Sequence, residues 1–299
     1  MFFIVGSARS GTTLLRMMLN AHPDVAVPPE SRFIVELYQS DEVLVDDFLA
    51  RLGAHRRWIS WDTSIEDVRA QLAGTTTTTY PEAIEAAFMA FAQGRNKTRY
   101  GDKTPRYIQD LPLLARLWPD SRFVHLVRDG REVALSYADV PFGPNTVAKA
   151  AALWKERVST GMKQGRPLGD ERYVEMRYER LLANPEEEVK ALCSFLDLDF
   201  DPAMLDYAQH SRSEVLERAR LYNPNVTKSI ARTRSWDEQM PRGHVEVFEA
   251  IAGDTLTELG YERAFPSPGL MARLAGLAGR AGFPVGRLES SRITSSQES

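Results

Sequence analysis

A glycine-bounded loop near the beginning of the sequence has the residue types and spacing of an anion-binding site. Gly6 and Gly11 enclose a short segment that contains Arg9, and the hydroxyl residues Thr12 and Thr13 follow directly. Glycine allows a backbone to approach a ligand closely, while arginine and hydroxyl groups donate hydrogen bonds to phosphate or sulfate oxygens. The loop is therefore predicted to bind a ligand that carries such a group.

The residues on either side of the loop indicate a strand followed by a helix. Residues 1–5 form a short apolar run that is typical of a buried strand, and residues 14–19 have apolar side chains at helical spacing. The helix would begin at the end of the loop. Its unpaired backbone N–H groups and the positive end of its dipole would then favour a bound anion.

The spacing of the two glycines matches the start of a Walker A loop, but the lysine of that motif is absent. Thr12 occupies the lysine position, and no obvious aspartate at the end of a later strand is placed to hold magnesium. A magnesium-dependent triphosphatase is therefore disfavoured. Taken alone, the loop also fits a glycine turn without a ligand, so the other motifs must decide.

Charged residues also follow two other segments. Residues 25–27 can form a short strand, and Glu30 and Arg32 come after it. Lys103 follows a Gly-Asp pair, which predicts a turn, and precedes Pro105. Open α/β sheets bind ligands at the carboxyl ends of their strands. Glu30 and Lys103 are therefore candidate site residues, and each also fits a solvated loop.

A second candidate anion-binding segment follows the apolar residues 121–127, which are predicted to form another buried strand. Arg128-Asp-Gly comes directly after it, and Ser136 lies on the helix predicted next. A guanidinium group suits a phosphate because it can donate two parallel hydrogen bonds to its oxygens. The triplet alone is weak evidence, but two such patterns, each after a strand, support one another.

Together these motifs resemble the sulfotransferases that use 3′-phosphoadenosine 5′-phosphosulfate, PAPS. Their first loop has a basic residue followed by Ser-Gly-Thr-Thr, as at residues 9–13, and their second motif has the arginine and serine found here as Arg128 and Ser136. The basic residue of the first loop is an arginine here, and in this the chain resembles the branch that includes protein-tyrosine sulfotransferases and bacterial relatives. In that branch a Glu-Thr-Arg stands where this chain has Glu30-Ser-Arg32. The resemblance covers roughly residues 1–35 and 99–262.

The resemblance implies a role for each candidate residue. Glu30 would be the catalytic base, Arg9 and Lys103 the catalytic cations, and Arg32 a residue that binds the acceptor. The residues expected to bind the nucleotide are Arg9, Ser10, Gly11, Thr12, Thr13, Arg128, Ser136, Tyr178, Lys228, Ser229 and Arg232. Core packing is an equal alternative for Tyr178, and within residues 228–234 the sequence does not single out the basic residue that reaches the ligand.

The implied reaction moves the sulfuryl group of PAPS to a hydroxyl or amine and leaves PAP, the desulfated nucleotide. Positioning and electrostatic stabilisation would supply most of the rate, as in phosphoryl transfer. No metal is expected, because arginine and lysine take the place of magnesium. A P-loop kinase and a non-catalytic nucleotide-binding module remain as alternatives, and the acceptor can be a peptide, glycan, lipid or small molecule.

The predicted fold is a P-loop-like, three-layer α/β domain with a central parallel sheet and a helical insertion. The single domain is expected over residues 1–265, with the insertion at about 33–98. Residues 75–79 are five threonines and are expected to be a polar linker. Residues 266–299 are predicted to form a peripheral helix and a disordered tail, with a membrane-surface helix as the less favoured alternative.

Composition excludes some classes of function. The 299 residues carry a net charge of −4, which argues against a general nucleic-acid-binding protein. No run of apolar residues is long enough to cross a membrane, and the single cysteine, Cys193, excludes an intrachain disulfide and is expected in the core. These features, with no leader-like segment before the first strand, predict a cytoplasmic protein. The oligomeric state cannot be read from the sequence.

Overall fold

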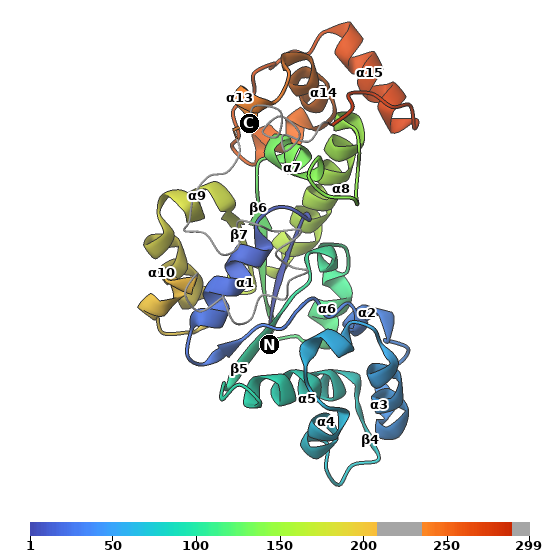
Figure 1. Ribbon diagram of the computed structural model, residues 1–299, viewed down its shortest axis with the longest axis vertical. Helices are drawn as coiled ribbons and strands as arrows, with labels where there is room; N and C mark the ends of the chain where they lie inside the picture. Colours follow the sequence, from blue (N-terminus) through green and yellow to red (C-terminus); the bar gives the residue numbers. More distant parts are fainter. Residues whose placement is uncertain (208–234, 289–299) are drawn as a thin grey trace, which may run out of the picture.

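The central element of the structure is β1 (Phe2–Gly6), the middle strand of a five-stranded sheet (Figure 1). The computed structural model describes residues 1–207 and 235–288. Within them the strand order is β2-β5-β1-β6-β7, and every pair in this sheet is parallel. The other strands of the sheet are β2 (Val25–Ala26), β5 (Arg99–Lys103), β6 (Arg122–Val127) and β7 (Tyr173–Arg177).

The register of the strands aligns their carboxyl ends. Ile4 of β1 pairs with Lys103 of β5, and Gly6 pairs with Leu126 of β6. The chain leaves β1 toward one side of the sheet, to β2, and later crosses from β5 to β6 on the other side. This reversal of direction at β1 marks the place where open α/β sheets bind ligands.

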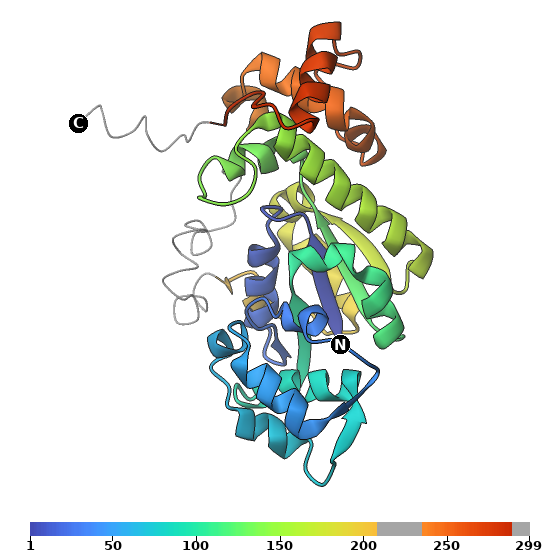
Figure 2. The same cartoon turned by 90° about the vertical axis from the view of Figure 1, so that its right-hand side faces the viewer.

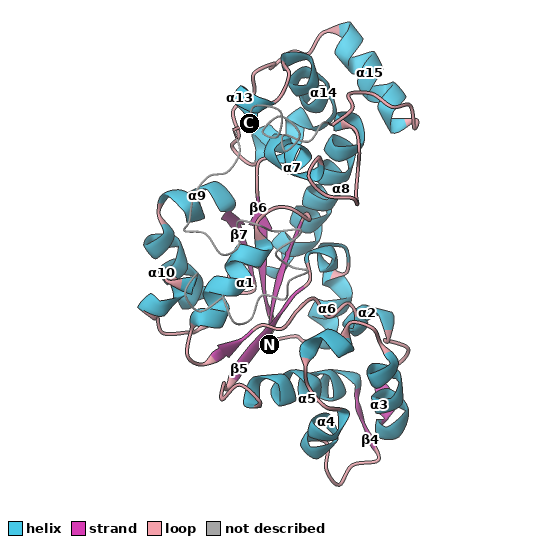
Figure 3. Cartoon of the chain, in the orientation of Figure 1, coloured by secondary structure: helices cyan, strands magenta, loops and turns pink. Residues whose placement is uncertain are grey.

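The sheet is covered by helices on both faces, which confirms the predicted α/β class (Figure 3). Phe2 and Ile4 pack into one apolar cluster, with α1 and α10, whereas Phe3 and Val5 pack into a second cluster on the opposite face. A strand buried on both faces requires continuous apolar residues, as β1 has. The helices that contact strands of the sheet include α1 (Thr12–Ala21), α5 (Tyr80–Gln93), α8 (Val147–Gly165) and α9 (Tyr178–Ala183). Side chains of α6 (Leu111–Leu117) and α10 (Pro185–Leu196) belong to the two apolar clusters.

Strand β5 corrects the turn that was predicted at Gly101–Asp102. Its sequence is polar, but it lies between β2 and β1 and its last three residues are buried. Gly101 makes this possible because a Cβ atom there would lie 2.3 Å from Cε2 of the Phe2 ring. The neighbouring strand therefore fills the space that a side chain would need.

The segment between β2 and β5 is mostly helical, as predicted. It contains α2 (Phe33–Glu36), β3 (Glu42–Leu44), α3 (Val45–Ala54), the 3-10 helix η1 (Trp58–Trp61), α4 (Ile65–Gln71), β4 (Thr77–Thr79) and α5 (Tyr80–Gln93). The threonine run is not the linker that was predicted, because Thr77–Thr79 pairs with β3 as an antiparallel strand. Thr79 also caps α5 by a reciprocal capping box with Glu82.

The remaining helices lie at the opposite end of the molecule from α3–α5 (Figures 1 and 2). They are α7 (Gly130–Tyr137), α13 (Trp236–Gln239), α14 (Arg242–Glu258) and α15 (Leu270–Arg280); short 3-10 helices η2 (Pro105–Gln109), η3 (Arg166–Leu168) and η4 (Pro202–Met204) complete the described part of the chain. None of the described helices has the length and apolar character needed to cross a membrane. The expected disordered tail, residues 290–299, lies outside the described residues.

The close approach of β5 to β1 generates a stability prediction. Gly101→Ala should lower the free energy of unfolding by about 1–3 kcal/mol, because the new methyl group overlaps the Phe2 ring. Urea unfolding followed by tryptophan fluorescence would measure this. Gly243→Ala is the control, since no described atom outside its own helical turn lies within 4 Å of a Cβ there, and it should be neutral or slightly stabilising. Equal urea midpoints for Gly101→Ala and wild type would contradict the packing argument.

Candidate active site

The loop after β1 ends at the N-terminus of α1. Gly11 is the N-cap residue with φ 94°, and no side chain of the described residues caps this helix. Arg9 also has a positive φ, 74°, which for a residue other than glycine costs of order 1–3 kcal/mol. Ser10 is fully buried, and its Oγ has no hydrogen-bond partner among the described residues. The loop therefore offers uncapped helix N–H groups and an unused hydroxyl beside Arg9, as an anion site requires.

Two predicted binding motifs meet at Arg9. Its Nε donates a hydrogen bond of 2.9 Å to Oγ of Ser136 on α7. Nη1 of Arg128, which follows β6, lies 3.4 Å from the carbonyl oxygen of Arg9 and donates to it. These contacts join residues 119 and 127 positions apart in the chain, so the fold brings the first loop and the Arg128 motif together.

Tyr178 completes this group at the start of α9. A Cβ atom at Gly11 would lie 2.3 Å from Cδ2 of the tyrosine ring, so the ring packs directly on the loop. The guanidinium carbon of Arg128 lies 4.6 Å from the centre of the same ring, in cation–π geometry. Tyr178 therefore lies in the candidate site, and it is also 8% exposed, as core packing would require.

Glu132 holds Arg128 in place, a contact that the sequence analysis missed. Its Oε2 accepts hydrogen bonds from Nε and Nη2 of Arg128 at 3.2 and 3.0 Å, and both side chains are buried. Glu132 follows Arg128 by four residues, and this spacing could have predicted an ion pair between them, since residues four apart are neighbours on a helix. A guanidinium has five N–H donors, so the contacts to Glu132 and Arg9 leave donors on Nη1 and Nη2 for a ligand.

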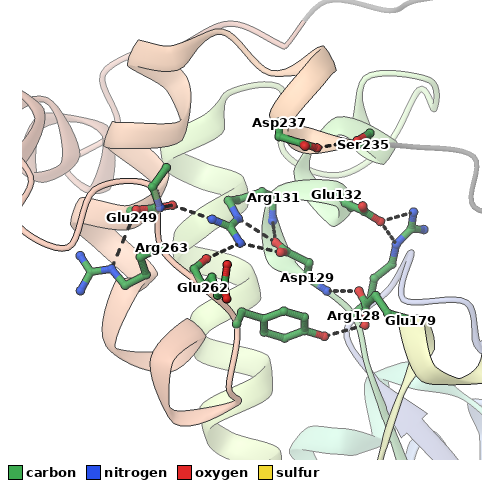
Figure 4. A network of polar contacts seen from close by, with 12 residues as sticks. Arg128, Asp129, Arg131, Glu132, Glu179, Ser235, Asp237, Glu249, Glu262 and Arg263 are labelled. Atoms are coloured by element: carbon green, nitrogen blue, oxygen red, sulfur yellow. Dashed lines mark hydrogen bonds and ion pairs between the residues drawn. The ribbon is translucent and has the colours of Figure 1, made fainter. Parts of the chain in front are cut away.

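A buried polar network fixes the turn that follows Arg128 (Figure 4). Asp129 caps α7 and forms an ion pair of 2.7 Å with Arg131. Arg131 also pairs with Glu249 of α14 at 2.6 Å. Glu179 accepts from the backbone N–H of Asp129 and from the hydroxyl of Tyr261. The turn is thus tied to α9 and α14, which limits the positions that Arg128 can adopt.

Glu30, Lys103 and Arg32 form a second group. Oε1 of Glu30 lies 3.1 Å from Nζ of Lys103, and Oε2 lies 3.6 Å from Nη2 of Arg32. Burial alone would raise the pKa of Glu30, but the charge and hydrogen bond of Lys103, with the charges of Arg32 and Arg57, lower that pKa below its ordinary value. Glu30 is therefore ionised near neutral pH, as a base must be.

A buried network of hydroxyl and carboxyl groups lies next to this second group. Oγ1 of Thr104 donates to Asp102 at 3.2 Å and accepts from the backbone N–H of Ser31 at 3.2 Å. The hydroxyl of Tyr107 lies 3.0 Å from Oγ of Ser31. Burial raises the pKa of Asp102 to about 7, against the opposing effect of its hydrogen bonds. The network links the residue after Glu30 to the strand that carries Lys103.

Other sequence predictions have mixed outcomes. Cys193 is buried, as predicted. His125 in β6 is also buried, and its Nδ1 lies 2.6 Å from the hydroxyl of Tyr173. Thr12 is the buried first residue of α1, and Thr13 follows it at the helix start. Lys228, Ser229 and Arg232 lie outside the described residues.

The two groups share one edge of the sheet. The loop after β1, Lys103 at the end of β5 and Arg128 after β6 follow three adjacent parallel strands. One group presents arginine, hydroxyl and helix N–H donors, and the other an ionised carboxylate beside a lysine. Such an arrangement can hold an anionic group, stabilise negative charge that develops during a reaction, and accept a proton.

The chain is similar in sequence to known sulfotransferases. The model of the sulfotransferase family matches residues 2–202. The chain is 27% identical over 279 residues to a protein-tyrosine sulfotransferase of Drosophila melanogaster, covering 88% of this chain and 52% of the fly protein. It is 27% identical to the nodulation protein NoeE of Sinorhizobium fredii, over 93% of this chain and 69% of that protein. The chain thus spans about half the length of the fly relative.

Solved structures show the same fold. The sulfotransferase domain of the Synechococcus PCC 7002 olefin synthase superposes with a TM-score of 0.62 at 23% identity, over 88% of this chain and 94% of that domain. At this identity the likeness concerns the fold, and it confirms the P-loop-like class that the sequence predicted.

The ion pair of Glu30 generates a prediction about its pKa. The variant Lys103→Met removes the cation closest to Glu30 but leaves the Glu30 side chain buried. Because burial raises the pKa of a carboxyl group and the cation lowers it, the pKa of Glu30 should rise above its wild-type value. Carbon-13 NMR titration of the glutamate carboxyl groups would measure the change, with Glu30→Gln assigning the signal. In the wild type the pair stabilises the folded state above the unfolded pKa of about 4.3, and this contribution is lost as the pH falls through the depressed folded pKa.

The exposed Lys149 on α8 provides the control. Lys149→Met should leave the Glu30 titration where it is in the wild type. An unchanged midpoint in Lys103→Met would show that Lys103 is not the cause of the lowered pKa.

Proposed function

The chain belongs to the sulfotransferase family, and from this premise we propose that it transfers the sulfuryl group of PAPS to an acceptor hydroxyl or amine. The proposal rests on one observation: the two candidate anion-binding motifs, the loop after β1 and the Arg128 motif, lie in contact. Arg9 of the loop contacts both Ser136 and Arg128. A ligand with two separated phosphate-type groups fits such a pair of motifs. PAPS has a phosphosulfate at one end and a phosphate on its ribose.

The described residues fit this donor. The uncapped N-terminus of α1 and the unpartnered, buried hydroxyl of Ser10 suit the phosphosulfate. The remaining donors of Arg128 suit the ribose phosphate, together with Ser136, which contacts Arg9 as Arg128 does. Tyr178, which packs against Arg128, is proposed to lie near the base. Glu132 neutralises part of the Arg128 charge, so the fit depends on directed hydrogen bonds as well as on net charge.

Glu30 is proposed as the base in this reaction. As the acceptor oxygen forms its bond to sulfur, the bond between sulfur and the bridging phosphate oxygen breaks, and the acceptor proton passes to the carboxylate of Glu30. Lys103 and Arg9 would stabilise the negative charge on the departing oxygen. Because Lys103 is paired with Glu30 at 3.1 Å, one contact holds both the base and the cation at the end of β5. PAPS supplies the activated sulfuryl group.

The names of the relatives suggest the first acceptor to test. Several are protein-tyrosine sulfotransferases, so we propose the phenolic hydroxyl of a tyrosine in a peptide as the leading acceptor class. Arg32, which is 3.6 Å from Glu30 and partly exposed, is proposed to contact the acceptor. Glycans, lipids and small molecules are the other classes to include in a screen.

Binding of the product nucleotide tests the donor site without an acceptor. Calorimetry in metal-free buffer should show that PAP binds the wild type, and that Arg128→Ala and Ser136→Ala each weaken binding by at least about tenfold. Ser136→Ala is included because Arg128→Ala also removes the ion pair of the buried Glu132 carboxylate with Arg128, which can lower stability. Arg116→Ala removes an exposed arginine that pairs with Asp41 and should bind PAP like wild type. No PAP binding, or binding only of ATP with magnesium, would contradict the proposed donor and favour a kinase.

Removal of the proposed base tests the chemistry separately. The wild type is first tested with a panel of acceptors: a tyrosine peptide, a glycan and a phenol. With the acceptor that the wild type sulfates, Glu30→Gln should reduce the transfer of radiolabelled sulfate by about 10²- to 10⁴-fold. Its affinity for PAP should change by less than about threefold, because the base acts on the acceptor. The exposed Glu66→Gln serves as the matched control. PAP binding without sulfation of any acceptor would instead indicate a non-catalytic nucleotide-binding module.

A further inference from the structure

Helix α15 packs on the protein through its small residues. A Cβ atom at Gly279 would lie 2.2 Å from Cβ of Ala148 on α8, and one at Gly276 would lie 3.0 Å from Ile251 on α14. Ala272, on the same side of the helix, is buried. Glycine and alanine therefore allow the backbone of α15 to lie against α8 and α14. The helix is fixed in place by this contact.

The opposite side of α15 presents large apolar side chains to solvent. Leu270, Leu274 and Leu277 follow helical spacing and are 71%, 49% and 61% exposed; Met271 and, just beyond the helix, Phe283 are 77% and 64% exposed. We call the four exposed residues of the helix, Leu270, Met271, Leu274 and Leu277, the leucine face. Among the described residues, only Leu44, Ile59 and Phe142 are further large apolar side chains with comparable exposure. The leucine face is thus a cluster, and clusters of this kind mark binding surfaces.

The charge of this segment differs from that of the whole chain. Residues 264–288 contain three arginines, at positions 273, 280 and 287, and no aspartate, glutamate or lysine, whereas the chain as a whole has a net charge of −4. Arg273 and Arg287 are exposed. By helical periodicity Arg273 lies between the packed side and the leucine face. The leucine face therefore has a positive charge along one edge, while Glu246 of α14 accepts a hydrogen bond from the N–H of Gly269 at the start of the helix.

We propose that the leucine face of α15 docks on the surface of an anionic membrane. An exposed apolar stripe with basic residues at its edge is the pattern of helices that lie in the headgroup region, where apolar side chains insert and arginines contact lipid phosphates. A second copy of the chain is a poorer occupant, because residues 264–288 contain no aspartate or glutamate that could pair with the arginines of the other copy.

The position of α15 suits this docking. The helix lies at one end of the long axis of the molecule, and α3–α5 lie at the other (Figures 1 and 2). Because α15 is already folded and packed, binding requires no ordering of the helix, which removes a large part of the usual free-energy cost of docking. The surface would be used in addition to the proposed donor site and does not depend on it.

Co-sedimentation of the full chain with lipid vesicles tests the proposal. We expect binding to vesicles of about 70% phosphatidylcholine and 30% phosphatidylglycerol, a decrease of that binding with added salt, and at least about tenfold weaker binding to phosphatidylcholine alone. Leu274→Glu with Leu277→Glu should weaken binding to the anionic vesicles by at least about tenfold, and Arg273→Glu should weaken it to a smaller extent.

The chain offers matched controls. Leu44→Glu replaces an equally exposed leucine at the other end of the molecule, and Lys163→Glu reverses an exposed charge on α8; both should bind vesicles like wild type. Circular dichroism melting and PAP binding show whether each variant is folded. The proposal is overturned if the wild type does not bind anionic vesicles, or if the double variant binds them equally well. A dimer in light scattering that the double variant abolishes would assign the face to a second copy instead.

Discussion

Parallel pairing of β1 with its two neighbours is the constraint on which the candidate site depends. The loop after β1, Lys103 and Arg128 are far apart in the chain, and the shared direction of three adjacent strands places them at one edge of the sheet. A parallel sheet requires crossover connections, and here these connections supply α1 and the helical segment between β2 and β5. The strand order therefore determines where chemistry can occur, while the loops determine which chemistry it is.

Carboxylates accompany the positive charges of this edge. Arg128 is paired with Glu132, Lys103 with Glu30, and Arg131 with Asp129 and Glu249. Burying an arginine or a lysine alone is unfavourable, so a partner carboxylate is needed to hold the cation in position before a ligand arrives. Each pair also reduces the net positive charge. Ligand selection then rests on the directions of the remaining N–H donors and on the N-terminus of α1 more than on long-range attraction.

Sequence patterns predicted the local parts of the site better than the contacts between them. The loop at residues 6–13 and the Arg128 motif are contiguous, so their strands and helices could be predicted from periodicity and turn residues. Strand β5 was missed because its residues are polar, and only the packing of Phe2 on Gly101 explains their burial. The contact of Glu249 with Arg131 joins residues 118 positions apart, and no local pattern records it. The chemical roles of Glu30 and its neighbours stay predictions from resemblance.

The backbone of Arg9 has a consequence for how this loop can change. With φ 74° the position suits glycine, and an arginine there lowers the stability of the fold. The same arginine supplies the side chain that reaches Ser136 on α7 and so connects two segments of the site. Stability and ligand binding therefore place opposite demands on one residue. A variant selected only for heat resistance would tend to lose Arg9, and a library designed for thermostability should keep this position fixed.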